Sequence, residues 1–268
     1  MSTPATPTLT LAVVLALVLA ACGGGSDETT VAAPLPAAST FYDPGWIGAF
    51  GATVGGTRPR HLVAASRQDG GFFGVYGEEV ATGFKAYGML IGPGDPASNP
   101  SRYKGAGWDS DKQVPFMVDL TIDATVPAMS GTLTAGSEQR TVAGGVVPAV
   151  GYRFDLAASL ASVAGHWELT TDRGLRIAMD VDSEGNITGR FGRCSIRDSK
   201  LAPTKTGYGV FAITLRFWRG IDVCDEPQGS SDEYFGFAVV YSPLAGGSQL
   251  VVGALGGWDE GLAATGKR

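Results

Sequence analysis

The sequence has few of the residues on which most enzyme chemistry depends. Among its 268 residues there are only 3 cysteines and 2 histidines, and just 17% are Asp, Glu, Lys or Arg. It contains no G-x-S-x-G motif, and no H-x-x-x-H or C-x-x-C spacing that could contribute to a zinc site. These absences argue against a hydrolase with a nucleophile elbow and against a zinc protein.

Basic residues are fewer than acidic ones, with 20 Lys and Arg against 26 Asp and Glu and a formal net charge of -6. Nucleic-acid binding requires basic side chains that neutralise phosphates, so nucleic acid is not an expected partner. The same balance argues against an anionic membrane surface as an electrostatic partner. Composition alone therefore gives no reason to expect a polyanionic partner.

Long hydrophobic runs are also missing, apart from one uncharged apolar stretch from Leu9 to Ala21. A transmembrane helix needs about 20 apolar residues, so this stretch is too short to span a bilayer. Its length suits the hydrophobic region of a secretory signal that ends in small residues at a cleavage site. Residues 1–21 are therefore predicted to be a signal peptide that is removed.

The tetrapeptide Leu19-Ala20-Ala21-Cys22 resembles the lipobox of bacterial lipoprotein precursors, because all its positions match the pattern [LV]-[AST]-[GA]-C. The resemblance implies that Cys22 is acylated, becomes the first mature residue and anchors the protein to a membrane. Gly23 follows, and under the enterobacterial sorting rule this implies an outer-membrane lipoprotein of the cell envelope, with either the periplasmic or the outer orientation open. One departure is that the first ten residues contain no Lys or Arg, whereas signal peptides usually begin with positive charge.

Cys194 and Cys224 are the cysteines that remain if Cys22 carries the lipid. An exported protein folds in an oxidising compartment, so we predict a disulfide bond between them. On the chain-entropy model, closing such a loop stabilises the fold by roughly 3–4 kcal/mol. The competing interpretations, a free thiol or a metal ligand, have no supporting His/Cys cluster nearby.

The mature chain divides into a tether and two lobes. Residues 22–40 are rich in Gly, Ala, Pro, Ser and Thr, have no hydrophobic period, and are predicted to be a lipidated tether. The one short stretch with helical propensity, Leu156–Ser162, marks a change of texture in the sequence. We place the domain boundary there, between an N-terminal lobe of residues 41–155 and a C-terminal lobe of residues 156–268.

Short alternating runs of apolar residues, separated by turns rich in Gly and Pro, predict strands throughout both lobes. In the N-terminal lobe they are Arg60–Ser66, Phe72–Glu79, Phe84–Ile91, Tyr103–Trp108, Phe116–Val126 and Met129–Ala135. In the C-terminal lobe they are Leu175–Val181, Asn186–Phe191, Tyr208–Phe217, Tyr234–Tyr241 and Ser248–Ala254. The predicted fold class is all-β, with two small antiparallel β-barrel or sandwich lobes. A closed barrel is favoured for the C-terminal lobe, because closure removes exposed strand edges.

Several short motifs of the C-terminal lobe follow one another in a recognisable order. They are Gly165-His166-Trp167, Asp182-Ser183-Glu184-Gly185-Asn186-Ile187-Thr188-Gly189, Cys194, Tyr208-Gly209-Val210, Cys224 and Tyr234-Phe235-Gly236-Phe237-Ala238. This order is similar to that of a group of uncharacterised proteobacterial lipoproteins, and His61–Ser66, Gly74–Tyr76 and Met129–Leu133 fit the same group. The resemblance implies a two-lobe β architecture, but motifs made mainly of glycines, aromatics and cysteines indicate almost nothing about a ligand.

Two kinds of motif imitate ligand sites without the context that the chemistry requires. The segment Asp180–Ile187 has the acidic spacing and the glycine of a calcium loop, but Phe191 stands where a bidentate Glu is needed. Its flanks alternate as strands, so we predict a solvated hairpin turn. The stretches Gly92–Ala97 and Gly207–Ala212 match a phosphate-binding fingerprint, yet neither leads from a strand through a turn into a helix.

The remaining candidates for chemistry are better explained as structural residues. His61 and His166 are the only histidines, and both are predicted to lie at strand ends. The adjacent carboxylate pairs Glu78-Glu79, Asp225-Glu226 and Asp232-Glu233 point to opposite strand faces or lie in loops, which suits solubilising charge. Aromatic residues could line a sugar or hydrophobic-ligand cleft, but small β domains usually bury them in the core or at a barrel mouth. They are Trp46, Tyr76, Tyr87, Trp108, Trp218 and Trp258.

The sequence therefore favours a non-enzymatic envelope lipoprotein that acts as a binding or interaction module for an unknown protein or small-ligand partner. No catalytic residue, metal site or cofactor is predicted. Two alternatives stay open. One is an envelope hydrolase or protease inhibitor, which would require His61 or His166 to share a pocket with an acid and a nucleophile. The other is a lipocalin-like carrier of a small ligand, which a barrel interior filled by side chains would exclude.

Overall fold

The structure is a computed structural model, in which all the described residues belong to the unit Pro34–Arg268. The described residues are 46–55, 60–67, 71–80, 83–93, 100–110, 112–123, 128–145, 158–203, 209–218, 233–241, 247–256 and 260–268. The predicted signal peptide, Cys22, the tether and Cys224 lie outside them, so what was predicted for these parts stays a prediction.

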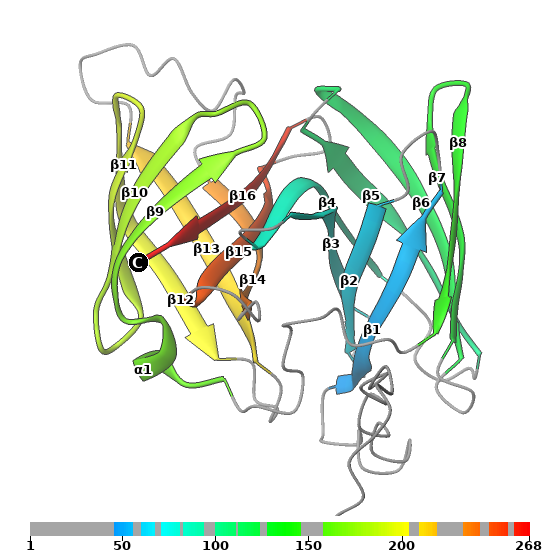
Figure 1. Ribbon diagram of the computed structural model, residues 1–268, viewed down its shortest axis with the longest axis horizontal. Coiled ribbons are helices and arrows are strands. Elements are labelled where there is room, and N and C mark those ends of the chain that lie inside the picture. The colour runs from blue at the N-terminus through cyan, green and yellow to red at the C-terminus, as the bar shows by residue number, and fades with distance from the viewer. Residues whose placement is uncertain are drawn as a thin grey trace, which may run out of the picture. The chain divides into compact units, whose positions relative to one another are not determined.

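Eight antiparallel strands form a closed barrel in the first half of the chain, here called the N-terminal barrel (Figure 1). Each strand pairs with the next one in sequence, and β1 closes the ring against β8. The strands are β1 (Trp46–Val54), β2 (Arg60–Arg67), β3 (Gly71–Val80), β4 (Gly83–Pro93), β5 (Ser101–Asp109), β6 (Val114–Asp123), β7 (Ala128–Ala135) and β8 (Glu138–Gly145). Such an up-and-down order requires only short connections, which agrees with the hairpin-length pieces in the sequence.

The second half repeats this architecture in the C-terminal barrel, which one short helix, α1 (Leu160–Val163), precedes. Its strands are β9 (Gly165–Thr171), β10 (Arg176–Val181), β11 (Asn186–Phe191), β12 (Cys194–Pro203), β13 (Val210–Trp218), β14 (Glu233–Tyr241), β15 (Gln249–Leu255) and β16 (Gly261–Lys267). The ring closes where β16 pairs with β9. The predicted all-β fold with two antiparallel barrel lobes is therefore confirmed.

Strand β10 illustrates how the sequence pattern determines the fold. Ile177, Met179 and Val181 are buried inside the barrel, whereas Arg176 and Asp180 on the opposite face are exposed. Successive side chains of a strand point to opposite faces, so this alternation of apolar and polar residues selects one face for the core. The short stretch of helical propensity near the predicted domain boundary overlaps the helix α1, which occupies Leu160–Val163 among the residues that the structure describes.

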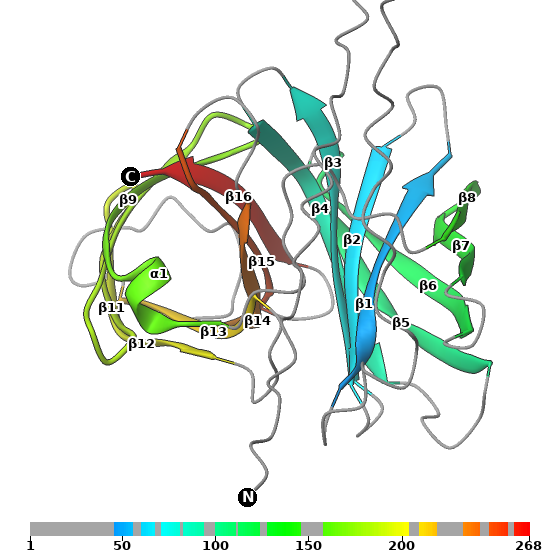
Figure 2. The ribbon, with the colours of Figure 1, turned by 60° about the horizontal axis from the view of Figure 1, so that its bottom comes forward.

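Large side chains fill the interior of the C-terminal barrel. The fully buried Trp167 donates a hydrogen bond from Nε1 to the carbonyl oxygen of Val163 at 2.6 Å. Because Val163 belongs to α1, this contact holds the helix over one opening of the barrel (Figure 2). Elsewhere in the interior, the ring of Phe217 lies 5.6 Å from that of Phe191 and 5.3 Å from that of Tyr234. The barrel is thus packed with aromatic side chains and is not hollow.

A separate apolar cluster joins the two barrels. From the N-terminal barrel it contains Val63, Val75, Phe84, Ala86 and Met89, and from the C-terminal barrel Val210, Phe237, Val239, Tyr241, Val251 and Ala263. All these side chains are buried although they point out of their own barrels. The outward faces of these strands therefore form a second kind of core, which we call the inter-barrel cluster.

The close approach in this cluster depends on a glycine. A Cβ atom added to Gly253 of β15 would lie only 2.7 Å from Val75 Cγ2 and 2.9 Å from Met89 Cβ. Contacts below 3.0 Å are essentially never observed for real Cβ atoms, so any side chain at position 253 would push β3 and β4 away. Gly253 therefore allows β15 to lie directly against the N-terminal barrel.

A buried side-chain amide completes the contact between the barrels. Gln249 Oε1 accepts a hydrogen bond from the Phe84 backbone N–H at 2.7 Å, and Gln249 Nε2 donates one to the Phe84 carbonyl oxygen at 2.9 Å. Strand β5 pairs with β4 only from Gly88 to Ile91, so β5 does not reach these two backbone groups. The amide of Gln249 takes the place of the missing strand neighbour.

Candidate interaction surface

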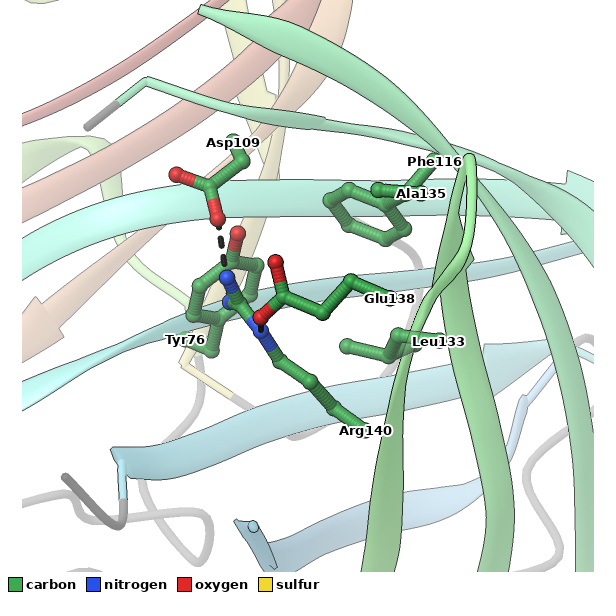
Figure 3. Close-up of a pocket in the computed structure, with 7 residues that line it drawn as sticks. All are labelled: Tyr76, Asp109, Phe116, Leu133, Ala135, Glu138 and Arg140. Atoms are coloured by element: carbon green, nitrogen blue, oxygen red, sulfur yellow. Dashed lines mark hydrogen bonds and ion pairs between the residues drawn. The ribbon is translucent and has the colours of Figure 1, made fainter. Parts of the chain in front are cut away.

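One small pocket lies in the N-terminal barrel, where polar side chains interrupt the apolar interior (Figure 3). It is lined by Tyr76, Asp109, Phe116, Leu133, Ala135, Glu138 and Arg140. Its polar groups come from separate strands, with Tyr76 on β3, Asp109 at the end of β5, and Glu138 and Arg140 on β8. Barrel closure is what brings these residues together, since they are far apart in the sequence.

Arg140 connects two carboxylates in this pocket. Its Nη1 lies 2.9 Å from Asp109 Oδ2, and its Nε donates a hydrogen bond to Glu138 Oε1 at 2.9 Å. Lys112 adds a second cation, because its Nζ pairs with the Glu138 carboxylate and its backbone N–H donates to Asp109 Oδ1 at 3.0 Å. Asp109 is only 2% exposed and a buried carboxylate requires such partners, so the network balances its own charges.

The network changes the acidity of two of its members. Hydrogen bonds from Lys112 and Arg140 lower the pKa of Glu138 to about 2. Burial, together with the adjacent Asp109 carboxylate, raises the pKa of the Tyr76 phenol. The Tyr76 hydroxyl is fully buried and has no hydrogen-bond partner among the described residues, and it points toward Arg140 and Asp109 (Figure 3). Tyr76 is therefore a neutral phenol and not a phenolate at neutral pH.

The pocket is too small for an organic ligand. Its volume is about 10 Å³, which is room for about one water molecule, whereas ligand pockets usually have about 300–1,000 Å³. A water molecule there would be able to satisfy the Tyr76 hydroxyl. We therefore interpret this cluster as a group of polar residues that closes the interior of the N-terminal barrel and whose charges neutralise one another.

His166 is the histidine for which the structure gives the clearest surroundings. Its Nδ1 lies 2.8 Å from Asp180 Oδ1 and its Nε2 lies 2.9 Å from Glu168 Oε1. These two hydrogen bonds raise the pKa of the imidazole. With a carboxylate on each ring nitrogen, the protonated ring donates twice and has no lone pair available for a general base. All three side chains are more than half exposed, so the cluster lies on the open surface.

The other predicted candidates are scattered over the molecule. His61 is exposed on β2, opposite Gly77 of β3. Glu78 accepts a hydrogen bond from Tyr87 at 2.9 Å, while Glu79 accepts one from Tyr241 of the other barrel at 3.4 Å. Glu78 and Glu79 therefore do not act as two facing carboxylates. Trp46 and Trp258 carry no described side chain, and Asp225, Glu226 and Asp232 lie outside the described residues.

The acidic segment after β10 is a hairpin turn, as predicted. Asp182 Oδ1 accepts hydrogen bonds from the backbone N–H groups of Glu184 at 2.8 Å and Asn186 at 2.9 Å, and its Oδ2 accepts one from the Asn186 amide at 2.7 Å. These hydrogen bonds, led by those from Asn186, lower the pKa of Asp182. Gly185 has a φ of 81°, a conformation that glycine adopts without strain. The carboxylate thus organises the turn itself.

The aromatic candidates divide between the core and the surface. Tyr76 and Trp108 are buried, as small β domains usually require. Trp218, in contrast, ends β13 on the outward face and is 62% exposed, so it does not seal the barrel mouth. Phe235 of β14 and Met117 of β6 are also exposed, by 52% and 62%. Trp218 is therefore an exposed aromatic residue on the outer surface of the C-terminal barrel.

Arginines surround Trp218 on this surface. Arg190 of β11 pairs with Ser195 of β12, and Ser195 pairs with Trp218 of β13, so these three outward residues form one row across the sheet. Arg197 and Arg216 lie two residues from Ser195 and from Trp218 along β12 and β13, and all three arginines are exposed. We call this set of outward residues, Arg190, Ser195, Arg197, Arg216 and Trp218, the arginine face.

Few acidic groups compensate the arginine face. Arg216 Nε pairs with Glu233 Oε1 at 2.6 Å, whereas Arg190 and Arg197 have no ion pair among the residues that the structure describes. From Asn186 to Trp218 the sequence has 6 Lys and Arg but only 1 acid, Asp198, in a chain whose formal net charge is -6. This part of the sequence therefore has a local excess of positive charge, which the negative net charge of the whole chain does not reveal.

The described part of the chain contains no group of three or more His, Cys, Asp or Glu side chains that could hold a metal ion. No helix within it is long and apolar enough to cross a bilayer. The chain matches no protein-family model, and comparisons with curated proteins and with solved structures found no match. A functional interpretation therefore rests on the residues and their geometry.

Proposed function

We propose that this chain is a non-enzymatic lipoprotein of the bacterial cell envelope, anchored to the outer membrane through acylated Cys22, and that its joined barrels act as an interaction module. One observation supports the interaction module. Buried side chains fill the interior of both barrels, so a partner is met on the outer surface. The lipobox Leu19–Cys22 is what supports the anchor.

A lipocalin-like carrier is less well supported. Such a carrier requires an interior cavity of about 300 Å³ or more. In the C-terminal barrel, Trp167, Phe211 and Tyr234 are each fully buried in the middle of the apolar cluster, and α1 lies over one opening. The described pocket of the N-terminal barrel has room for about one water molecule.

An envelope hydrolase is also less well supported. Its base would have to be a histidine with a free ring nitrogen inside a cleft that also holds a nucleophile. His166 has both nitrogens in hydrogen bonds to carboxylates on the open surface. We therefore assign His166, Glu168 and Asp180 to the surface electrostatics of the C-terminal barrel.

The proposal includes a disulfide bond between Cys194 and Cys224. Cys194 is fully buried in the C-terminal barrel at the start of β12. Cys224 belongs to the segment between β13 and β14. Trp218, the last residue of β13, pairs with Ser195, the residue that follows Cys194.

Lipid attachment is tested by expressing the full chain in a bacterial host with labelled palmitate. We expect label in the wild-type protein, accumulation of the unprocessed precursor under globomycin, and loss of label in a Cys22→Ala variant. The intact mass should correspond to a mature protein that begins at Cys22. Because reduction opens the proposed disulfide, this mass should then increase by that of two hydrogen atoms. A Cys22→Ala protein that still fractionated with membranes after a high-salt wash, which removes electrostatically bound protein, would contradict the anchor. Crosslinking in intact cells would identify neighbours.

A further inference from the structure

We propose that the arginine face of the C-terminal barrel docks onto an anionic phospholipid membrane, and that this contact orients the anchored body against the bilayer. The inference rests on the proposed function, because the lipid at Cys22 is what keeps the body near a membrane. It adds a second, electrostatic contact. The overall charge of -6 gave no reason to expect such a contact.

The position of the face in the fold leaves it accessible. Strands β14, β15 and β16, together with Val210 of β13, supply the C-terminal half of the inter-barrel cluster. In a ring of eight strands, β11 is opposite β15, so β11 and β12 face away from the N-terminal barrel (Figure 2). Arg190 and Arg197 on these strands are exposed. The second barrel therefore does not cover the arginine face.

The chemistry of the face suits phospholipid headgroups. A guanidinium group binds phosphate through two parallel hydrogen bonds, and Arg190 and Arg197 have no ion-pair partner among the described residues to compete with a phosphate. Trp218 stands in the same row as Arg190 and is 62% exposed. Tryptophan is typical of membrane interfaces, since its ring is apolar and its N–H is polar. An acidic protein surface would match the arginines, but it would not require an exposed tryptophan beside them.

The acids around the face neutralise only part of its charge. Glu233 pairs with Arg216, and Asp198 follows Arg197 at an irregularity of β12, with a φ of 49°. Asp182 and Glu184 lie at the opposite ends of the strands, in the β10–β11 turn. Asp180 pairs with Thr188, and Glu168 lies in the row of Arg190 beyond Ala178 of β10, but both carboxylates are hydrogen-bonded to His166. These acids are therefore on β9, β10 and the turn, whereas the arginines are on β11, β12 and β13, and this separation around the barrel would orient it at an anionic surface.

Because the lipid anchor already holds the protein at the bilayer, a weak contact between the arginine face and the membrane is sufficient for docking. The segment between Cys22 and β1 spans at most about 80 Å when fully extended, so the barrels stay within this distance of the bilayer. Tethering converts docking into an intramolecular step with a high effective concentration. Each basic residue near an anionic surface contributes roughly a fivefold gain in affinity, so a few arginines are enough for docking.

The test uses the mature lipidated protein reconstituted in vesicles that contain brominated lipid, which quenches tryptophan fluorescence at the membrane surface. In phosphatidylglycerol vesicles we expect quenching that is absent in phosphatidylcholine vesicles and is lost in a Trp218→Phe variant. The double variant Arg190→Glu/Arg197→Glu should lower the docking equilibrium constant by roughly tenfold or more. The matched control Arg102→Glu/Lys104→Glu makes the same charge change on exposed residues of β5 and should leave quenching unchanged.

Two outcomes would overturn the proposal. Quenching that is equal in the two kinds of vesicle, or unchanged in the Arg190/Arg197 variant, would show that the face does not bind anionic lipid. Arginine-dependent retention on immobilised polyglutamate without docking to vesicles would assign the face to an acidic protein instead. If the mass of the preparation shows no acyl group at Cys22, the proposed anchor fails. Co-sedimentation of the unlipidated protein with the same vesicles then tests the face separately.

Discussion

At the scale of single residues, the polar network of the N-terminal barrel shows how a β-barrel accommodates charge. Asp109 is buried and has Arg140 as its direct partner, and Glu138 extends the network to the surface, where its side chain is 46% exposed. Removing one partner of a buried ion pair leaves an uncompensated charge, which is usually costly. We therefore regard these residues as coupled, with Glu138 as the member that water reaches most easily.

Glu138 gives a prediction about pH. Its pKa is lowered from 4.5 to about 2, so the carboxylate stabilises the folded state above the unfolded pKa, and this contribution disappears as the pH falls from about 4.5 to about 2. A Glu138→Gln variant should therefore be less stable than the wild type at pH 6 and equally stable near pH 2. Urea unfolding at a series of pH values, followed by circular dichroism, measures this difference.

Gln139 is exposed and is the next residue along β8, so it provides the control. The difference in stability between a Gln139→Glu variant and the wild type should not depend on pH between pH 6 and pH 2. A difference between wild type and Glu138→Gln that stayed constant from pH 6 to pH 2 would show that the ionised carboxylate is not responsible. Half-exposed ion pairs are screened by solvent and salt, so we expect the difference to be small and to shrink at high ionic strength.

At the scale of secondary-structure elements, the edge between β4 and β5 explains why the barrels require a side-chain bridge. The pairing of β4 with β5 stops at Gly88, and Gln249 of β15 reaches the free backbone groups of Phe84. Gly83, which precedes Phe84, has a φ of 139°, and a Cβ atom added to Gly83 would lie 2.5 Å from Gln249 Oε1. The glycine therefore leaves the space that the amide occupies.

The bridge leads to a prediction about stability. A Gln249→Leu substitution leaves the buried N–H and C=O of Phe84 without partners, which costs about 1–3 kcal/mol for each unsatisfied group. Because two groups lose their partners, the free energy of unfolding in urea should fall by about 2–6 kcal/mol. Gln139→Leu replaces an exposed glutamine on β8 and should change stability by less than about 0.5 kcal/mol. Equal effects of the two substitutions would mean that the amide bridge is unimportant.

At the scale of the whole molecule, the inter-barrel cluster determines whether the barrels behave as one folding unit. Phe237 lies on the outward face of β14, is 1% exposed, and places its ring 5.7 Å from that of Phe73 in the other barrel. Phe235, two residues earlier on the same face, is 52% exposed. The two phenylalanines are therefore a matched pair that differs mainly in contact with the other barrel.

We predict that Phe237→Ala lowers the free energy of unfolding by about 3–5 kcal/mol, because a large buried side chain is lost from a packed cluster. Phe235→Ala should change it by less than about 0.5 kcal/mol. Scanning calorimetry should show one transition for the wild type and for Phe235→Ala, and two separate transitions for Phe237→Ala, as the barrels lose their coupling. Two transitions already in the wild type would show that the cluster does not couple the barrels.

The comparison of the two phenylalanines also shows a limit of sequence reasoning. Phe235, Phe237, Val239 and Tyr241 alternate along one strand, and this pattern predicts that they share a face. They do share it, but three of them are buried against the other barrel while Phe235 is exposed. Alternation indicates which side chains point the same way, but it does not indicate what covers them.

The fold class, most of the strands and the turn at Asp182–Gly185 could be predicted from the sequence alone, because these depend on local periodicity and on the conformations of glycine and aspartate. The sequence also contains the excess of basic residues from Asn186 to Trp218. That Arg190, Arg197 and Trp218 share an exposed face, and that Gln249 reaches Phe84, is visible only in the folded molecule. Those contacts depend on strand register and on packing between barrels, which join residues that no local pattern connects.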